Sequence, residues 1–270
     1  MSEAAERDMT ALPGVDARAV VSPRARLAAG VRVGAYAIVG DDVELGEGCL
    51  LHPHAVVRGP ARLGRDNVLH PFCSVGCDPQ DLKYAGEPTT LEIGDRNVFR
   101  ECVTVSRGTV QGGGVTRVGS GNLFMAYAHI AHDCTVGSNT IFANSATLAG
   151  HVIVEDFASV GAFSPVHQFC RVGRYAYIGA CTAVTQDVPP FSLVVNERDN
   201  RCFGVNTVGL ERQGFGAERI EALKRAYRLL LRSKLNTAQA VEQMRATLNG
   251  SSDVAELITF IEASERGLIK

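Results

Sequence analysis

Two imidazoles, a carboxylate and a thiol occur within six residues of this chain, in the segment HIAHDC at 129–134. A neutral imidazole can remove a proton near pH 7, and a carboxylate beside it can hold the ring in place. The same side-chain types are also common metal ligands. On a repetitive surface they could instead be isolated polar residues in contact with solvent. The period of the surrounding sequence helps to decide between these three interpretations.

Large apolar residues recur at every sixth position over most of the chain. One run extends from Val21 to Val75, and another extends from Val118 to Val184. A period of six fits neither an α-helix nor the alternation of a single strand. It is typical of a hexapeptide β-helix, in which short parallel strands turn a corner every six residues and complete a coil in about 18 residues. We therefore expect an all-β, left-handed parallel β-helix with the apolar column inside.

Two irregular stretches interrupt this period, near 78–90 and 109–115. A solenoid coil tolerates an insertion only at a corner, and such insertions gather on a binding face. The first stretch is dense in polar groups and the second is rich in glycine. We expect the first loop to bind a polar ligand.

The period stops near Val188-Pro189-Pro190, because proline lacks the N–H group that a parallel ladder needs. A helical pattern follows from about Ala217, and Asn236 and Ser251 are expected to precede two further helices. We predict three parts: an N-terminal extension (1–18), the β-helix (19–205) and a small C-terminal α-helical domain of about three helices (206–270).

In a regular coil, residues 18 positions apart lie on top of one another, so His132, Gly150 and Gln168 fall in one line. Gly150 has no side chain, so open space and a bare backbone N–H lie beside the imidazole of His132. This arrangement suits a general base next to a donor for a negative oxygen. Three further histidines are expected on the same face: His129, His151 and His167.

The spacing of possible ligands does not favour a metal site. The chain has eight cysteines but no C-x2-C pair. Several occupy a column of small residues two positions before the apolar column, so we expect them to be small buried side chains. His129 and His132 are separated by two residues, whereas the zinc-binding pair of hexapeptide-solenoid carbonic anhydrases is separated by four. We expect no bound metal.

Composition excludes some classes of protein. A net charge of −2 and a sequence pI near 6.4 argue against a nucleic-acid-binding surface. The first 18 residues contain no apolar core of a signal peptide, and no run of about 18 apolar residues could span a membrane. We expect a cytoplasmic protein.

Longer motifs carry a resemblance to a known family. The segments QDLKYAGEPT (80–89), RGTVQGGG (107–114), AHIAHDCTVG (128–137) and RGLIK (266–270) resemble those of the UDP-N-acetylglucosamine O-acyltransferases that begin lipid A synthesis in Gram-negative bacteria. The resemblance covers the chain from about residue 9 onward. It implies a homotrimer with active sites between subunits. It also implies transfer of an (R)-3-hydroxyacyl group from acyl carrier protein to the glucosamine 3-hydroxyl of UDP-N-acetylglucosamine, without a cofactor.

The resemblance also implies roles for individual residues. His132 matches the general base, Asp133 its orienting carboxylate and Gly150 the backbone donor to the oxyanion. Ala180 matches a position that helps to limit acyl-chain length. The remaining matches are substrate-binding residues: Gln80, Asp81, Lys83, His129, His151, Gln168, Asn206 and Arg212.

The helical part suggests a docking site for a partner protein, and two functions other than O-acyl transfer stay open. Arg225, Arg228 and Arg232 share one helix face, on which an acidic carrier protein could dock. The same base could N-acylate a 3-amino analogue of the UDP-sugar. A non-catalytic scaffold would keep the repeat but would not need clustered polar residues.

Overall fold

The computed structural model describes residues 14–196 and 200–269. The chain divides into two compact units, 1–134 and 135–270. The predicted extension at 1–18 lies outside the described residues as far as residue 13.

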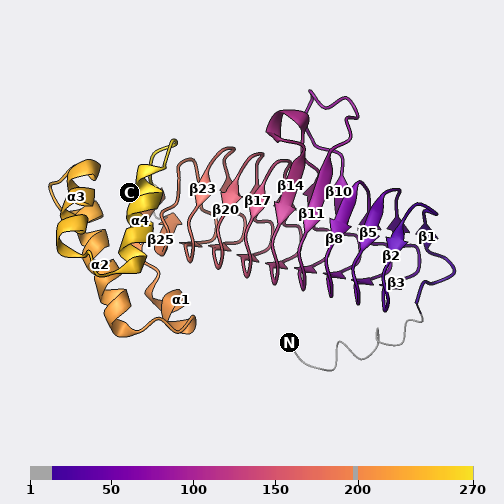
Figure 1. Ribbon diagram of the computed structural model, residues 1–270, viewed down its shortest axis with the longest axis horizontal. Coiled ribbons are helices and arrows are strands. Elements are labelled where there is room, and N and C mark those ends of the chain that lie inside the picture. The colour runs from indigo at the N-terminus through magenta and orange to yellow at the C-terminus, as the bar shows by residue number, and fades with distance from the viewer. Residues whose placement is uncertain (1–13, 197–199, 270) are drawn as a thin grey trace. The chain divides into compact units, whose positions relative to one another are not determined.

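The first unit is a parallel β-helix built from very short strands (Figure 1). Its strands are β1 (Val20–Val21), β2 (Arg26–Leu27), β3 (Arg32–Val33), β4 (Ile38–Val39), β5 (Val43–Leu45), β6 (Leu50–Leu51), β7 (Val56–Val57), β8 (Ala61–Leu63), β9 (Val68–Leu69), β10 (Ser74–Cys77), β11 (Thr90–Ile93), β12 (Val98–Phe99), β13 (Thr104–Ser106), β14 (Val115–Val118), β15 (Leu123–Phe124) and β16 (His129–Ile130). Every third strand pairs in parallel, which makes three sheets.

The register between coils shows where the two insertions enter. Val21 pairs with Val39, 18 residues on, as the period predicts. Leu63 pairs with Ile93, because the segment between β10 and β11 adds residues to that coil. Ile93 then pairs with Val118, because the next coil contains the short 3₁₀ turn η1 (Val110–Gly112). Figure 1 shows both insertions projecting from the same side of this unit.

Most members of both sequence columns are buried, as predicted. The apolar column fills the interior, where Phe99 and Phe124 are fully buried and stack at 4.9 Å between ring centroids. Burying such a side chain contributes on the order of 1.5–3 kcal/mol. In the small column, Cys49 and Cys73 are fully buried, and burial raises the pKa of the Cys73 thiol to about 12. These thiols are therefore packing groups and not nucleophiles.

The second unit continues the same pattern and then changes. Its strands are β17 (Thr135–Val136), β18 (Ile141–Phe142), β19 (Thr147–Leu148), β20 (Ile153–Val154), β21 (Ser159–Val160), β22 (Pro165–Val166), β23 (Arg171–Val172), β24 (Tyr177–Ile178), β25 (Ser192–Asn196) and β26 (Asn200–Val205). Leu148 pairs with Val166, again 18 residues on.

The two prolines do not end the parallel ladder, so that expectation was wrong. Ile178 of β24 pairs in parallel with Val194 of β25, and β26 then returns antiparallel to β25. Pro189 and Pro190 lie in the corner before β25, where the neighbours Val188 and Phe191 donate the N–H bonds to the previous coil. The prolines therefore remove no hydrogen bond that the ladder uses.

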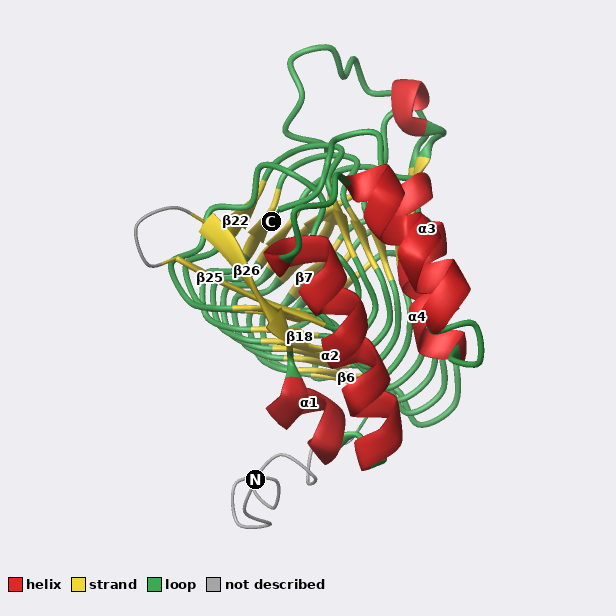
Figure 2. Ribbon diagram, turned by 90° about the vertical axis from the view of Figure 1, so that its left-hand side faces the viewer, coloured by secondary structure: helices red, strands yellow, loops and turns green. Residues whose placement is uncertain are grey.

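Four helices follow: α1 (Thr207–Arg212), α2 (Ala217–Arg232), α3 (Thr237–Thr247) and α4 (Ser252–Glu262). Asn236 and Ser251 cap α3 and α4 as predicted. The short α1 was not predicted, because six residues carry too little apolar periodicity to be visible. Helices α2, α3 and α4 lie side by side (Figure 2). Among the described residues, no helix combines the length and apolar character that crossing a membrane requires.

Candidate functional site

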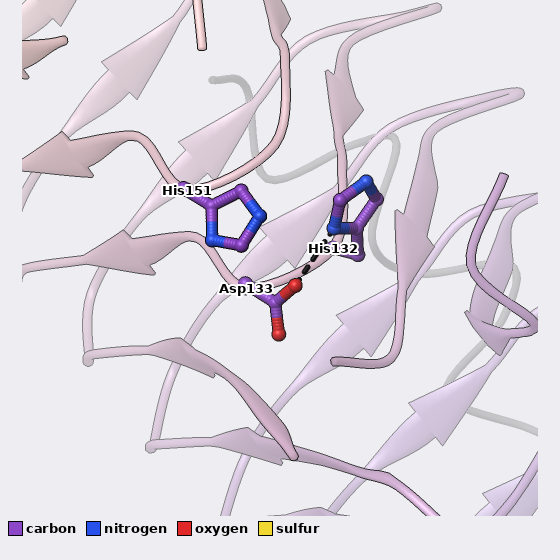
Figure 3. A group of neighbouring side chains, drawn as sticks. All are labelled: His132, Asp133 and His151. Atoms are coloured by element: carbon purple, nitrogen blue, oxygen red, sulfur yellow. Dashed lines mark hydrogen bonds and ion pairs between the residues drawn. The ribbon is translucent and has the colours of Figure 1, made fainter. Parts of the chain in front are cut away.

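His132 and Asp133 form a hydrogen-bonded pair at a corner of the first unit. Nδ1 of His132 lies 2.7 Å from Oδ2 of Asp133 (Figure 3). Because a carboxylate only accepts hydrogen bonds, Nδ1 carries the proton and the lone pair is on Nε2. The Asp133 side chain is 1% exposed and that of His132 is 15% exposed. A partly exposed imidazole oriented by a buried carboxylate has the geometry of a general base.

The Asp133 carboxylate has further donors from the second insertion. The backbone N–H of Thr109 donates to Oδ1 at 2.7 Å, and the Thr109 hydroxyl donates to Oδ2 at 2.7 Å. The Asp133 backbone N–H donates to Oγ1 of Thr116 at 2.8 Å. A buried carboxylate is costly unless it accepts such bonds, so these contacts keep it in place.

His129 lies on β16, on the same short segment. Its Nδ1 lies 2.7 Å from Oγ1 of Thr104 on β13. Burial lowers the pKa of His129 below its ordinary value, and the nearby His132 lowers it further. His129 is therefore neutral at pH 7 and can donate or accept a hydrogen bond, but it does not carry a positive charge to a substrate.

The first insertion carries Gln80, Asp81 and Lys83, and all three were expected in the site. Asp81 shapes the loop, because its Oδ1 accepts from the Lys83 backbone N–H at 2.9 Å. Gln80 and Lys83 are exposed. Their side chains are therefore accessible to a polar ligand.

Arg107 fixes this loop to the β-helix, although it was not singled out from the sequence. Its side chain is buried, and Nη1 donates to the carbonyls of Gly59 and Gly76 at 3.0 and 2.7 Å. Nη2 donates to the Tyr84 hydroxyl at 2.9 Å and also pairs with Asp78. One guanidinium thus connects backbone carbonyls near β7 and within β10 with Asp78 and Tyr84 of the loop.

In the second unit, Gly150 and His151 lie on one coil and Gln168 lies on the next. The carbonyl of Gly150 accepts from the backbone N–H of Phe169 at 3.3 Å. His151, also drawn in Figure 3, stacks on Phe169 with ring centroids 4.5 Å apart. Gln168 is exposed beside Phe169. The 18-residue alignment of Gly150 with Gln168 is consistent with the register of β19 and β22.

The last predicted positions lie at α1 and after β24. Asn206 caps α1: Oδ1 accepts from the Gly209 N–H at 3.2 Å, and Nδ2 donates to the Tyr175 carbonyl at 3.2 Å. Arg212 ends α1 and is exposed. Ala180 is exposed just after β24.

The repeat places the chain in a broad class of enzymes first. Residues 24–59 and 116–150 match a family described as bacterial transferase hexapeptide (six repeats). Residues 187–269 match the second domain of UDP-N-acetylglucosamine O-acyltransferase.

Relatives that match nearly the whole chain show which family of hexapeptide-repeat transferases the chain belongs to. A protein of Alkalilimnicola ehrlichii is 59% identical over 95% of this chain and 99% of its own, and one of Herminiimonas arsenicoxydans is 52% identical over 95% and 99%. Both are named acyl-[acyl-carrier-protein]–UDP-N-acetylglucosamine O-acyltransferase. The chain belongs to this family of O-acyltransferases, which confirms the resemblance seen in its motifs.

Solved structures agree with this assignment. LpxA of Acinetobacter baumannii superposes with a TM-score of 0.92 at 40% identity, over 96% of this chain and all of that chain. The UDP-N-acetylglucosamine O-acyltransferase of Moraxella catarrhalis gives 0.91 at 37% identity, over 95% and 99%. The predicted fold class, a left-handed β-helix with a small C-terminal helical part, is confirmed.

Sequence reasoning missed the residues that hold the predicted ones. Thr109 on Asp133, Thr104 on His129 and Arg107 on the first loop were not predicted as contacts. The run of glycines after Thr109 was the available signal, because consecutive glycines can mark a close approach of backbone to another group. Nothing in the local sequence marks Thr104 or Arg107.

Replacing Arg107 by lysine should loosen the first loop. Lysine keeps the charge but cannot form the four-way contact of the planar guanidinium. Losing roughly 1.4 kcal/mol of hydrogen bonding should raise the open population, and therefore tryptic cleavage after Lys83, about tenfold. Mass spectrometry of the fragment ending at Lys83 would measure the rate. The control is Arg62→Lys, an exposed arginine; equal cleavage in all three proteins would show that Arg107 does not anchor the loop.

Proposed function

We propose that this chain transfers an (R)-3-hydroxyacyl group from acyl carrier protein to the glucosamine 3-hydroxyl of UDP-N-acetylglucosamine. This is the first step of lipid A biosynthesis, and we place it in the cytoplasm. The observation that carries the proposal is the His132–Asp133 pair, in a chain whose relatives are named for this reaction. Those relatives are named as O-acyltransferases, so N-acylation of a 3-amino sugar analogue is not favoured.

In this mechanism, Nε2 of His132 removes the proton of the sugar 3-hydroxyl while its oxygen attacks the thioester carbonyl. The oxygen of the tetrahedral intermediate becomes negative and accepts a hydrogen bond from the backbone N–H of Gly150. The placement of Gly150 beside His132 rests on the 18-residue repeat of the sequence. Collapse breaks the C–S bond, and the imidazolium returns its proton to the departing thiolate. No residue is acylated, and no cofactor takes part.

The substrate contacts follow from the exposed polar groups. Gln80, Asp81 and Lys83 would bind the sugar through the first loop, with His129, His151 and Gln168 as further sugar and diphosphate contacts. Asn206 and Arg212 would bind the nucleotide. The Asn206 amide still has one N–H and one lone pair after it caps α1 and donates to Tyr175. It can therefore cap the helix and bind the nucleotide at the same time.

The partner proteins are a second and third copy of the chain and acyl carrier protein. A row of stacked rings, Tyr36, His54 and Phe72, runs along a corner of the first unit, and Tyr36 and Phe72 are more than half exposed. Such an exposed aromatic row supports a subunit interface, as a homotrimer requires.

The basic face of α2 supports docking of the carrier protein. Arg225, Arg228 and Arg232 line a surface groove of about 400 Å³ between α2 and the end of α3. All three arginines are exposed, and Arg228 also pairs with Glu221 at 2.8 Å. Complementary charge between this face and an acidic carrier would increase the association rate.

Replacing His132 by alanine should lower kcat roughly 10²–10⁴-fold, the usual contribution of a general base, and leave the fold intact. Product formation from UDP-N-acetylglucosamine and acyl carrier protein would be followed by mass spectrometry. His52→Ala, at a histidine of another coil, is the matched control and should keep near-normal turnover. A folded His132→Ala protein with normal kcat would refute the general-base role.

A metal ion is the alternative to a general base at this corner, because imidazole and carboxylate groups such as those of His132 and Asp133 are common metal ligands. We propose that none takes part, since both Asp133 oxygens already accept hydrogen bonds from Thr109 and Oδ2 also contacts His132. Prolonged chelation should therefore leave the rate unchanged. Activity that is lost to a chelator and restored by zinc would establish the metal alternative.

Ala180 should shorten the acyl chain that the enzyme prefers. A methyl group at the end of a groove should exclude about one or two methylenes, each contributing roughly 0.8 kcal/mol of burial. We expect a preference for about 10 to 12 carbons, and a shift to longer chains in Ala180→Gly. The measurement is kcat/KM across a series of acyl donors, with Ala29→Gly on the first coils as control. Tyr177, 42% exposed nearby, would be the limiting residue if the optimum stays the same.

A further inference from the structure

The second insertion holds the Asp133 carboxylate at both oxygens. After β13 the chain forms the single turn η1, and Thr109 is its N-cap. Thr109 is 2% exposed, so its hydroxyl is shielded from solvent. Its N–H and its hydroxyl donate to the two different oxygens of Asp133, each at 2.7 Å. One residue thus fixes the plane of the carboxylate as well as its position.

The turn also sets the direction of the Thr109 hydroxyl. The backbone N–H of Gly112 donates to Oγ1 of Thr109 at 3.2 Å. Since that donor occupies an acceptor position of the hydroxyl oxygen, the hydroxyl proton is directed to Asp133. The chain of contacts runs from Gly112 through Thr109 and Asp133 to Nδ1 of His132.

Gly112 can approach this closely only because it lacks a side chain. A Cβ at this position would overlap the carboxylate carbon and both carboxylate oxygens of Asp133. An alanine would therefore displace either the turn or the carboxylate. Gly113 and Gly114, which follow in the same run, would have open space around a Cβ. The requirement for glycine against Asp133 thus belongs to Gly112.

We propose that Thr109 and Gly112 are positioning residues for acyl transfer, which hold Asp133 in the orientation that presents Nε2 of His132 to the sugar hydroxyl. This proposal rests on the general-base role of His132. Thr109 is buried and both residues lie directly against Asp133, so their effect should pass through that carboxylate. Misplacing a base by a fraction of an ångström reduces the rate of proton transfer more than it reduces substrate binding.

The test compares kcat and KM for four variants. Thr109→Val keeps the shape and removes the hydroxyl, so kcat should fall about tenfold with KM for UDP-N-acetylglucosamine nearly unchanged. Thr109→Ser restores the hydroxyl and should recover most of kcat. Gly112→Ala should lower kcat at least as much as Thr109→Val. Gln111→Ala, an exposed residue of the same turn, is the control and should stay within about twofold of wild type.

A double-mutant cycle separates positioning from a general loss of stability. If Thr109 acts through Asp133, Thr109→Val should have little further effect on kcat in an Asp133→Asn background. Full additivity would overturn the proposal, as would a normal kcat in Thr109→Val. Should Gly112→Ala fail to fold, Thr109→Val and Thr109→Ser still decide the question.

The outcomes also distinguish the positioning role of Thr109 and Gly112 from the general-base role of His132. If His132→Ala and Asp133→Asn keep normal turnover, the general-base mechanism is wrong and the positioning role falls with it. If both are impaired while Thr109→Val and Gly112→Ala are normal, only the positioning role is wrong.

Discussion

Parallel pairing between successive coils is the constraint on which the rest of this molecule depends. Each interior residue is fixed beside one partner in the next coil, as Val21 is beside Val39. Extra residues can therefore enter only at corners, where no ladder bond is interrupted. After both insertions the ladder resumes in register, and Phe99 still stacks on Phe124. The scaffold stays regular while the corners vary.

The corner at Asp133 shows how a β-helix can stabilise a buried carboxylate. The Asp133 side chain is almost fully buried, and an isolated buried carboxylate would cost several kcal/mol. Thr109 supplies two donors and His132 a third. The glycine-rich insertion therefore stabilises the negative charge of Asp133 in the His132–Asp133 pair, through the two donors of Thr109. A regular corner of the helix has no segment that could supply these donors.

The parts of the fold that the sequence could predict are those governed by a period or a local signal. The apolar column, the small column with Cys49 and Cys73, and the caps Asn236 and Ser251 all repeat or act over a few residues. The corner at Pro189-Pro190 was misjudged, because the missing N–H groups matter only if the ladder needs them at that point.

The sequence predicted the reactive groups of the site, but not the residues that hold these groups in place. His132 and Asp133 are adjacent in sequence, so their pairing needed no tertiary information. Thr109 reaches Asp133 across 24 residues through an insertion that has no period, and Arg107 reaches Gly59 across 48. Such contacts depend on how an irregular loop folds back, and a repeat pattern contains no information about that.

The burial of most cysteines has a practical consequence for chemical labelling. All eight cysteines lie within the described residues, and seven of them are buried or half-buried, whereas Cys181 is exposed. Burial raises the pKa of the Cys73 thiol to about 12 and that of Cys202 to about 11. Both thiols therefore remain almost entirely protonated at neutral pH, and a protonated thiol reacts slowly. A maleimide probe should thus attach mainly at Cys181, directly beside Ala180. The native chain therefore offers one exposed thiol for a fluorescent label, next to the proposed end of the acyl groove.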